Sequence, residues 1–206
     1  MRLYDSPFSG HAHRARVFLH ILGLSFETTV LNLGAGEHKS DAFRSLNPLM
    51  QVPVLVDDDA VIRDSTAILV YLAQRYDPAR TWLPVDATAA AQVQSWLSVA
   101  SRELFVGPCV ARLVKLFNAP FDHDAAVAST THVLSALFEP HLADRTWLVG
   151  DAPTIADLAC YGYLAAAHEG AFDLEPYPNV RAWLERVEAI PGFVAMPAAA
   201  DLMAAS

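Results

Sequence analysis

Short apolar runs alternate with helical patterns in the first third of the chain. Residues 2–5, 26–31, 52–56 and 60–63 are brief apolar or alternating runs, which are typical of strands. Residues 13–22 and 65–76 carry apolar side chains at helical spacing, with Ile68, Leu72 and Tyr76 four residues apart. The polar stretch 34–46 predicts a loop with at most one irregular helix. The order β-α-β followed by β-β-α predicts a four-stranded sheet with helices packed on it.

Helical patterns dominate the rest of the chain, over residues 89–117, 122–142, 154–168 and 179–189. Residues 1–78 hold 7 alanines and residues 79–206 hold 28, and alanine favours helices over strands. Pro108 follows Gly107 inside the first of these patterns and predicts a kink there. We therefore expect an α/β domain over residues 1–78, a linker over 79–88 and an all-helical domain over 89–206.

Composition and charge exclude several classes of protein. Of the 206 residues 53% are hydrophobic, which excludes intrinsic disorder. The 14 basic and 23 acidic residues give a net charge of −9, which disfavours nucleic acid and anionic lipid as partners. No signal-peptide pattern or long apolar run is present. Cys109 and Cys160 form neither a disulfide framework nor a zinc site, so we expect a cytoplasmic protein without a metal.

Two junctions near the N-terminus could bind anions or amines. Ser9 lies in the turn 6–10 before a helix, where a hydroxyl and unpaired N–H groups can stabilise a thiolate. Asp64 and Ser65 open a second helix, where the carboxylate suits an ammonium group and the hydroxyl suits a carboxylate. For both junctions the alternative is simple helix capping.

Two further motifs differ in what they predict. Pro53 at the start of a strand predicts an edge position or a cis-proline turn, either of which leaves the backbone of Val52 free for an extended ligand. The alternative is an ordinary strand-entry proline. The segment from Thr154 to Asp157 matches a capping box, which we interpret as structural. His11 and His13 are two residues apart and make a poor metal pair on a helix.

The order and spacing of several short motifs resemble the cytosolic glutathione transferases over nearly the whole chain. The segments that carry the resemblance are 36–39, 47–48, 51–55, 64–68, 71–72 and 150–157. The resemblance implies a thioredoxin-like N-terminal domain, an all-helical C-terminal domain, a homodimer, and glutathione as the co-substrate.

The resemblance also implies a set of glutathione-binding residues. The backbone of Val52, ahead of a cis Pro53, would pair with the cysteinyl part of the tripeptide. Asp64 and Ser65 would hold the γ-glutamyl end. The remaining members are Gln51, near that end, and His38 and Lys39, which would face the glycine carboxylate.

The resemblance indicates Ser9 as the residue that activates the thiol, as in the serine-type plant and bacterial classes. Tyr4 is the candidate for a tyrosine-type class, but it lies inside the first predicted strand. No cysteine lies in this segment, which excludes mixed-disulfide chemistry. His11 stands where many bacterial members have asparagine, and it could assist activation or simply be tolerated.

The implied reaction is attack of the glutathione thiolate on small hydrophobic electrophiles, as in detoxification, with peroxidase or isomerase activity as a side reaction. Phe8, Phe105 and Arg112 are the expected hydrophobic substrate site; alternatively, Phe105 is a core residue and Arg112 forms a salt bridge at the surface or in the dimer. A competing hypothesis is a non-catalytic protein that binds glutathione or a hydrophobic ligand. A third, less favoured, is a dimerising interaction domain of a larger assembly.

Overall fold

The computed structural model describes residues 1–204, and the chain divides into two units. The first unit joins Met1–Pro78 to the segment that begins at Pro191, and the second is Ala79–Ile190. The first division falls where the sequence indicates the end of the α/β domain. The segment from Pro191 onward differs from the expectation, because it belongs to the first unit.

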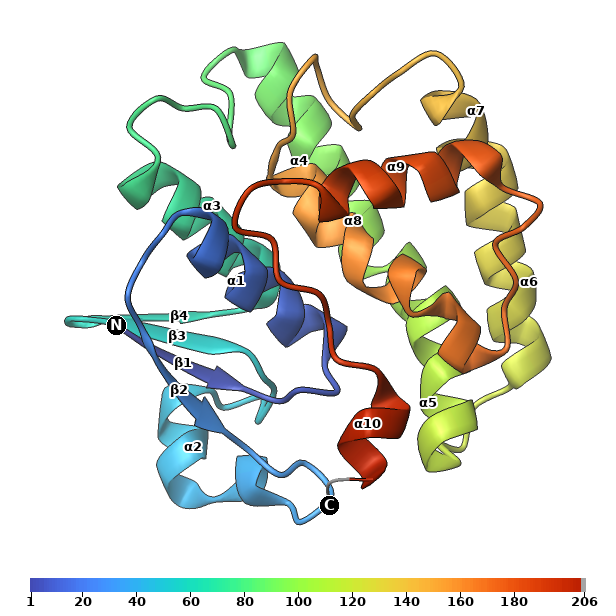
Figure 1. Ribbon diagram of the computed structural model, residues 1–206. Coiled ribbons are helices and arrows are strands. Elements are labelled where there is room, and N and C mark those ends of the chain that lie inside the picture. Colours follow the sequence, from blue (N-terminus) through green and yellow to red (C-terminus); the bar gives the residue numbers. More distant parts are fainter. Residues whose placement is uncertain (205–206) are drawn as a thin grey trace. The chain divides into compact units, whose positions relative to one another are not determined.

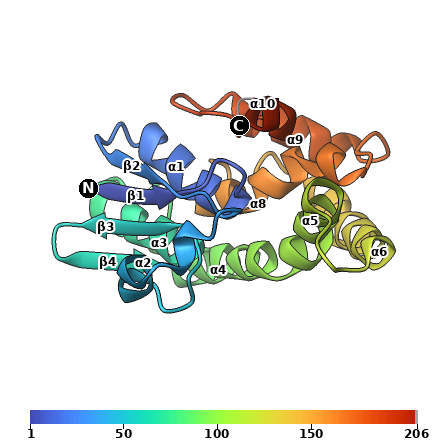
Figure 2. The same cartoon turned by 90° about the horizontal axis from the view of Figure 1, so that it is seen from below.

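A four-stranded sheet forms the centre of the first unit, as the sequence predicts. Its strands are β1 (Arg2–Asp5), β2 (Glu27–Val30), β3 (Val54–Asp57) and β4 (Ala60–Arg63), in the order β2-β1-β3-β4 (Figure 2). Strand β1 is parallel to β2 and antiparallel to β3, and β4 is antiparallel to β3.

The pairing of the strands brings four chain segments to one edge of the sheet. Tyr4 pairs with Val54, and Val54 pairs with Arg63. Asp5, at the end of β1, pairs with Val30, at the end of β2. The chain therefore leaves β1, β2 and β4, and enters β3, at the same edge.

Helices cover both faces of this sheet. Helices α1 (Gly10–Ile21) and α3 (Ser65–Tyr76) pack against each other on one face, and α2 (Asp41–Leu46) lies on the other (Figure 1). The predicted loop 34–46 thus holds α2 and a short 3-10 turn, η1 (Glu37–Lys39). Helix α1 begins three residues before the predicted start, because Ser9 caps it. The core between sheet and helices is apolar and fully buried, and includes Leu3, Phe18, Leu55, Ile68 and Leu72.

The second unit is helical, but two of the predicted long helices are interrupted. Its elements are α4 (Ala87–Ser101), η2 (Phe105–Cys109), α5 (Val110–Phe117), α6 (His123–Val133), η3 (Leu134–Phe138), α7 (Glu139–Leu142), α8 (Ile155–Ala165), η4 (Ala167–Gly170) and α9 (Pro178–Glu188). Both η2 and η3 are π-helical turns. Pro108 lies in the first of them, as the predicted kink requires. Gly107 packs closely on α6, since a Cβ there would lie 2.9 Å from Oγ1 of Thr130.

A buried carboxylate ties together three parts of the second unit. Asp157, which is fully buried, accepts hydrogen bonds from the backbone N–H groups of Thr154 (2.8 Å) and Leu148 (3.0 Å). It also accepts one from the indole Nε1–H of Trp183 on α9 (2.9 Å). The predicted capping box is confirmed, and its acidic member additionally fixes a loop and a neighbouring helix.

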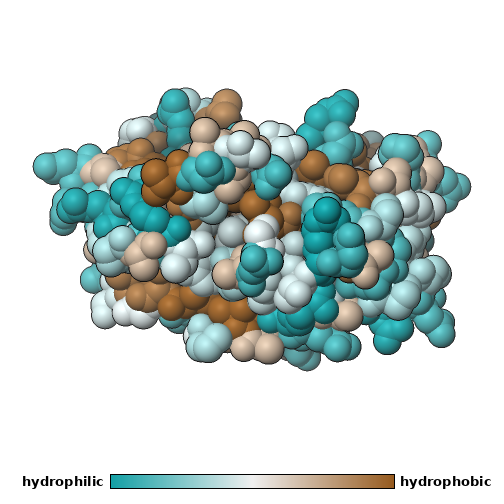
Figure 3. Space-filling view, turned by 90° about the horizontal axis from the view of Figure 1, so that it is seen from above, coloured by the Kyte–Doolittle hydropathy of each residue, from teal (hydrophilic) through white to brown (hydrophobic). Residues whose placement is uncertain are grey.

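Apolar and hydrophilic residues both reach the surface on the face seen in Figure 3. Exposed apolar side chains include Leu49, Val61 and Val85. Within the described chain, no helix is both long and apolar enough to cross a membrane.

A short helix, α10 (Ala199–Ala204), ends the described chain and was not predicted. The segment before it is fastened to α1 by His13, whose Nε2 lies 2.8 Å from the carbonyl oxygen of Val194. Burial lowers the pKa of His13 to about 4, and the charges of Arg16 and Arg14 contribute to this, although the bond to Val194 opposes it.

Acid should therefore weaken the fold through His13. A histidine in the unfolded chain takes up its proton near pH 6.5, whereas the folded state resists protonation until about pH 4. The unfolded state thus binds more protons in this window, and the free energy of unfolding should fall by about 3 kcal/mol as the pH drops through it. Urea unfolding at several pH values measures how the free energy of unfolding falls with pH. In His13→Gln this free energy should fall less over the same pH range. An equal dependence of the free energy of unfolding on pH in both proteins would show that His13 is not the residue responsible.

Candidate functional site

The first part of the site is the junction between β1 and α1. Ser9 is the N-cap of α1, with φ −90° and ψ 114°, and its Oγ accepts the N–H of Ala12 at 3.2 Å. Its own N–H donates to the carbonyl of Ser6 at 2.9 Å, which fixes the turn. Because Oγ already accepts a bond, its hydrogen remains for a ligand at the positive end of the helix.

The second part is the loop that enters β3. The peptide bond between Val52 and Pro53 is cis, one of the two geometries that the sequence suggests. Asn47, which is buried, donates from Nδ2 to the carbonyl of Gln51 (2.8 Å) and accepts the N–H of Leu49 at Oδ1 (3.1 Å). Asn47 has no role predicted from the sequence, yet its two hydrogen bonds hold the loop in place. Val52 precedes the strand residues that pair with β1 and β4, so its backbone lies outside both ladders.

The third part is the junction between β4 and α3. Asp64 has φ 75° and ψ 128°, a conformation that non-glycine residues rarely adopt and that is often found at functional sites. Its Oδ1 accepts the N–H of Thr66 (2.8 Å), the N–H of Ala67 (3.0 Å) and the hydroxyl of Thr66 (2.6 Å). Partial burial opposes ionisation, but these bonds and the charge of Arg14 hold the pKa of Asp64 below its ordinary value. Asp64 is therefore a carboxylate at neutral pH.

A buried cation that was not predicted from the sequence lies beneath this junction. Arg14 on α1 is 1% exposed, and its guanidinium donates to Oγ of Ser65 at 3.3 Å. The spacing along the sequence could have indicated its burial, because Arg14 precedes Val17 and Phe18 by three and four residues and so shares their inward face. Its charge favours an anion beside the Ser65 hydroxyl.

His11 lies in the first turn of α1, two residues after Ser9, and is partly buried. Burial lowers the pKa of His11 to about 3; the charge of Arg14 also lowers it, and that of Asp64 opposes the shift. His11 therefore enters the site as a neutral imidazole.

The remaining glutathione-binding candidates lie in two segments, one that follows β2 and one that precedes β3. His38 and Lys39 form the 3-10 turn η1 after β2; His38 is half-buried and Lys39 is exposed. Gln51 is exposed in the loop before β3. The structure thus gathers the ends of four segments that carry all eight predicted glutathione and thiol-activating residues: Ser9, His38, Lys39, Gln51, Val52, Pro53, Asp64 and Ser65.

The predicted residues of the hydrophobic substrate site have different surroundings. Phe8 is half-buried in the turn before Ser9, and Phe105, which is 39% exposed, opens η2. Arg112 is 2% exposed and forms an ion pair with Glu169 through its Nε. Arg112 thus forms a salt bridge, but a buried one inside the fold and not at the surface or in the dimer, as the alternative had it.

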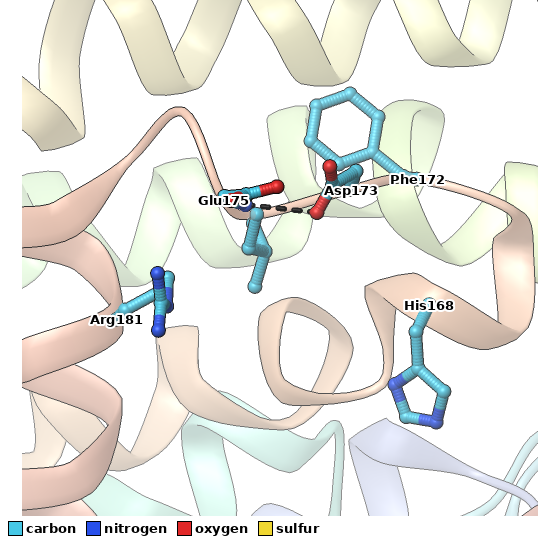
Figure 4. Close-up of a pocket in the computed structure, with 6 residues that line it drawn as sticks. His168, Phe172, Asp173, Glu175 and Arg181 are labelled. Carbon is cyan, nitrogen blue, oxygen red and sulfur yellow. Dashed lines mark hydrogen bonds between the residues drawn. The ribbon is translucent and has the colours of Figure 1, made fainter.

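Two surface cavities are lined by other residues. One, of about 440 Å³ in the second unit, is lined by His168, Phe172, Asp173, Leu174, Glu175 and Arg181 (Figure 4). The other, of about 570 Å³ in the first unit, is lined by Met1, Arg2, Ser25, Phe26, Glu27, Val56 and Asp58. Neither contains a predicted site residue. Among residues 1–204, no group of three or more His, Cys, Asp or Glu side chains could hold a metal ion.

Comparison with known proteins shows which family this chain resembles. The family model for the N-terminal domain of glutathione S-transferases matches residues 1–74, and the model for the C-terminal domain matches residues 119–191. Glutathione S-transferase 3 of Zea mays is 34% identical over 98% of this chain and 95% of its own. Maleylpyruvate isomerase of a Ralstonia species is 32% identical over 88% of this chain and 89% of its own.

Solved structures agree with the sequence comparisons. The crystal structure of a glutathione S-transferase from Xanthobacter autotrophicus superposes with a TM-score of 0.87, at 36% identity over 98% of both chains. The two family models, the identities and the shared thioredoxin-like and helical architecture show that the chain belongs to the glutathione S-transferase family.

Proposed function

We propose that this transferase activates the thiol of glutathione with the hydroxyl of Ser9. The observation that carries the proposal is the position of Ser9 as the N-cap of α1, at the sheet edge from which the other candidate residues also extend. Tyr4, the alternative activator, packs instead on Phe43 of α2, with ring centroids 5.7 Å apart.

Activation of the sulfur follows from ordinary electrostatics. The Ser9 hydroxyl donates a hydrogen bond to the sulfur, and the N-terminus of α1 supplies positive potential. Both favour the thiolate over the thiol, whose pKa is about 8.5 when free. Each unit by which the pKa falls corresponds to about 1.4 kcal/mol of differential stabilisation.

The tripeptide would bind through groups complementary to its own. The backbone of Val52 pairs with the cysteinyl unit as an added strand would, in a loop that Asn47 holds. Ionised Asp64 accepts the α-ammonium group, while Ser65, beside the charge of Arg14, binds the α-carboxylate. Gln51 lies nearby, and His38 and Lys39 bind the glycine carboxylate.

The second substrate is a small hydrophobic electrophile, and Phe8, in the turn before Ser9, is the apolar candidate of the first unit to contact it. Because a close relative is an isomerase, glutathione-dependent isomerisation is a second activity to assay beside conjugation. Detoxification, assembly as a homodimer and a cytoplasmic location, typical of such enzymes, complete the proposal.

Titration of the protein with glutathione at neutral pH, followed by far-ultraviolet difference absorbance, tests the proposal. A saturable thiolate band is the expected result. Binding without that band, with binding measured separately by calorimetry, would instead favour the non-catalytic hypothesis.

Removing the carboxylate of Asp64 should weaken glutathione binding. In Asp64→Ala the ammonium group loses a charge-assisted hydrogen bond, which corresponds to about a 10- to 100-fold higher Kd. The matched control is Asp86→Ala, because Asp86 caps α4 through the N–H of Ala89 in the same way. The control should lose about 1 kcal/mol of stability and leave Kd unchanged. Isothermal titration calorimetry gives the Kd for glutathione of both variants. Equal values would show that Asp64 does not bind glutathione.

A further inference from the structure

The segment from Pro191 to Ala204, here named the C-terminal strap, runs along α1 toward its N-terminus (Figure 1). Gly192 lies against the last turn of the helix, since a Cβ there would be 3.1 Å from the carbonyl oxygen of His20 and 3.1 Å from Cα of Ile21. Two residues later, the carbonyl of Val194 lies 2.8 Å from Nε2 of His13, near the start of the helix. The strap is therefore antiparallel to α1 and reaches the turn that carries Ser9.

His13 fastens the strap with its side chain. The ring is fully buried and packs edge-on against Phe193 of the strap, with centroids 6.1 Å apart. A carbonyl oxygen can only accept, so Nε2 carries the hydrogen and donates to Val194. Burial lowers the pKa of His13 to about 4, so the ring is neutral at neutral pH and keeps this single tautomer.

The same residue is joined to Ser9 through the backbone. The N–H of His13 donates to the carbonyl of Ser9 at 2.9 Å, and Oγ of Ser9 accepts the N–H of Ala12 at 3.2 Å. Ser9, Ala12 and His13 thus belong to one hydrogen-bonded turn. Whatever holds the His13 side chain also restrains the turn that orients the Ser9 hydroxyl.

We propose that His13 is a positioning residue for thiol activation: by holding the strap at Val194, it fixes the first turn of α1 so that the Ser9 hydroxyl meets the glutathione sulfur. The proposal rests on the proposed role of Ser9. It predicts that releasing the strap lowers the thiolate fraction of bound glutathione, although His13 itself touches neither substrate.

The test compares His13→Phe, which keeps an aromatic ring but cannot donate, with His13→Gln, whose amide can still donate. Two readouts are taken on the full chain: chymotryptic cleavage after Phe193, followed by intact mass, and the thiolate band at saturating glutathione. His13→Phe should be cleaved about tenfold faster and should lose most of the band, with a matching fall in kcat and little change in the KM for glutathione. His13→Gln should restore both. His20→Phe is the control, since His20 is an exposed histidine on the same helix and should change neither.

A second variant that releases the strap keeps the proposal testable if the His13 variants do not fold. Gly192 has φ +82°, and in Gly192→Ala the new Cβ would press on the backbone of α1. This variant should free the strap from its other end and weaken the thiolate band in the same way. In a Ser9→Ala background, neither variant should reduce the band further, because the proposed effect passes through Ser9.

The outcomes separate this proposal from the one on which it rests. A freed strap with an unchanged thiolate band would overturn the positioning role of His13, and so would an uncleaved strap in His13→Phe. An intact band in Ser9→Ala alone would overturn the role of Ser9, whatever the strap does.

Discussion

Turnover should fall by about 10- to 100-fold when Ser9 is replaced by alanine, while the affinity for glutathione stays nearly constant. A hydrogen bond to a charged group contributes about 1.5–3 kcal/mol, and here the charge is the thiolate. The sulfur is one small part of the tripeptide, which the other candidate residues would bind through its backbone, ammonium and carboxylates. Loss of Ser9 therefore removes activation and leaves most of the binding energy.

The measurement is kcat with a chromogenic aromatic electrophile, together with Kd for glutathione by calorimetry. Because Ser9 also caps α1, the alanine variant should lose about 1 kcal/mol of stability. Ser9→Gly separates the two effects, since glycine caps almost as well as serine yet lacks the hydroxyl. Ser9→Gly should be as inactive as Ser9→Ala and more stable. Unchanged turnover in both would exclude Ser9 and direct attention to the neutral imidazole of His11.

The sheet and the junctions around it were predictable because local patterns determine them. Strands β1 and β4 have the predicted bounds, and β2 and β3 lie within or beside their predicted runs. Asp64 and Thr154 are polar residues directly before apolar helical patterns, and both cap the helices that follow. Once the strands pair, the residues that follow or precede their ends lie at one edge of the sheet. This is why short motifs that are far apart in the sequence could indicate one site.

Features that depend on packing between distant segments could not be predicted in the same way. The break before Pro108 begins near Arg102, and close packing of Gly107 on Thr130, 23 positions away, accompanies the π-helical turn. The strap has no periodic pattern, and one of its attachments is a bond from His13 to a backbone carbonyl 181 positions later. Pattern analysis carries no information on such pairs.

Charged residues in apolar surroundings were the hardest to assign. Arg14 shares a helix face with Val17 and Phe18, and a charge there is informative only once its partner is known. Ser65, 51 positions away, supplies one partner. Arg112 shows the reverse case, because its expected contact with substrate competes with an ion pair to Glu169 that is buried, whereas the sequence suggested a salt bridge only at the surface or in the dimer. In both, folding decides what the charge meets.

The largest effect on stability is expected from Asp157→Ala, which removes the acceptor of four buried hydrogen bonds, three from N–H groups and one from the hydroxyl of Thr154. The N–H groups of Leu148 and Thr154 and the indole N–H of Trp183 would then be left without that partner in the core of the second unit. Each buried donor without a partner costs about 1–3 kcal/mol, so the expected loss is about 3–5 kcal/mol. For a chain of this length that corresponds to a fall in Tm of about 10 °C.

Asp122→Ala is the matched control, because Asp122 also caps a helix but is exposed and accepts the N–H of Ala125. It should lose only about 1 kcal/mol. Asp157→Asn is the informative intermediate, since its amide oxygen can still accept from Leu148 and Trp183 but its NH₂ opposes the N–H of Thr154. Urea unfolding of the three variants should therefore rank Asp122→Ala, Asp157→Asn and Asp157→Ala in order of increasing loss. If Asp157→Ala were no worse than Asp122→Ala, the carboxylate would be an ordinary cap, and the bonds to Leu148 and Trp183 would contribute nothing to the stability of the helical unit.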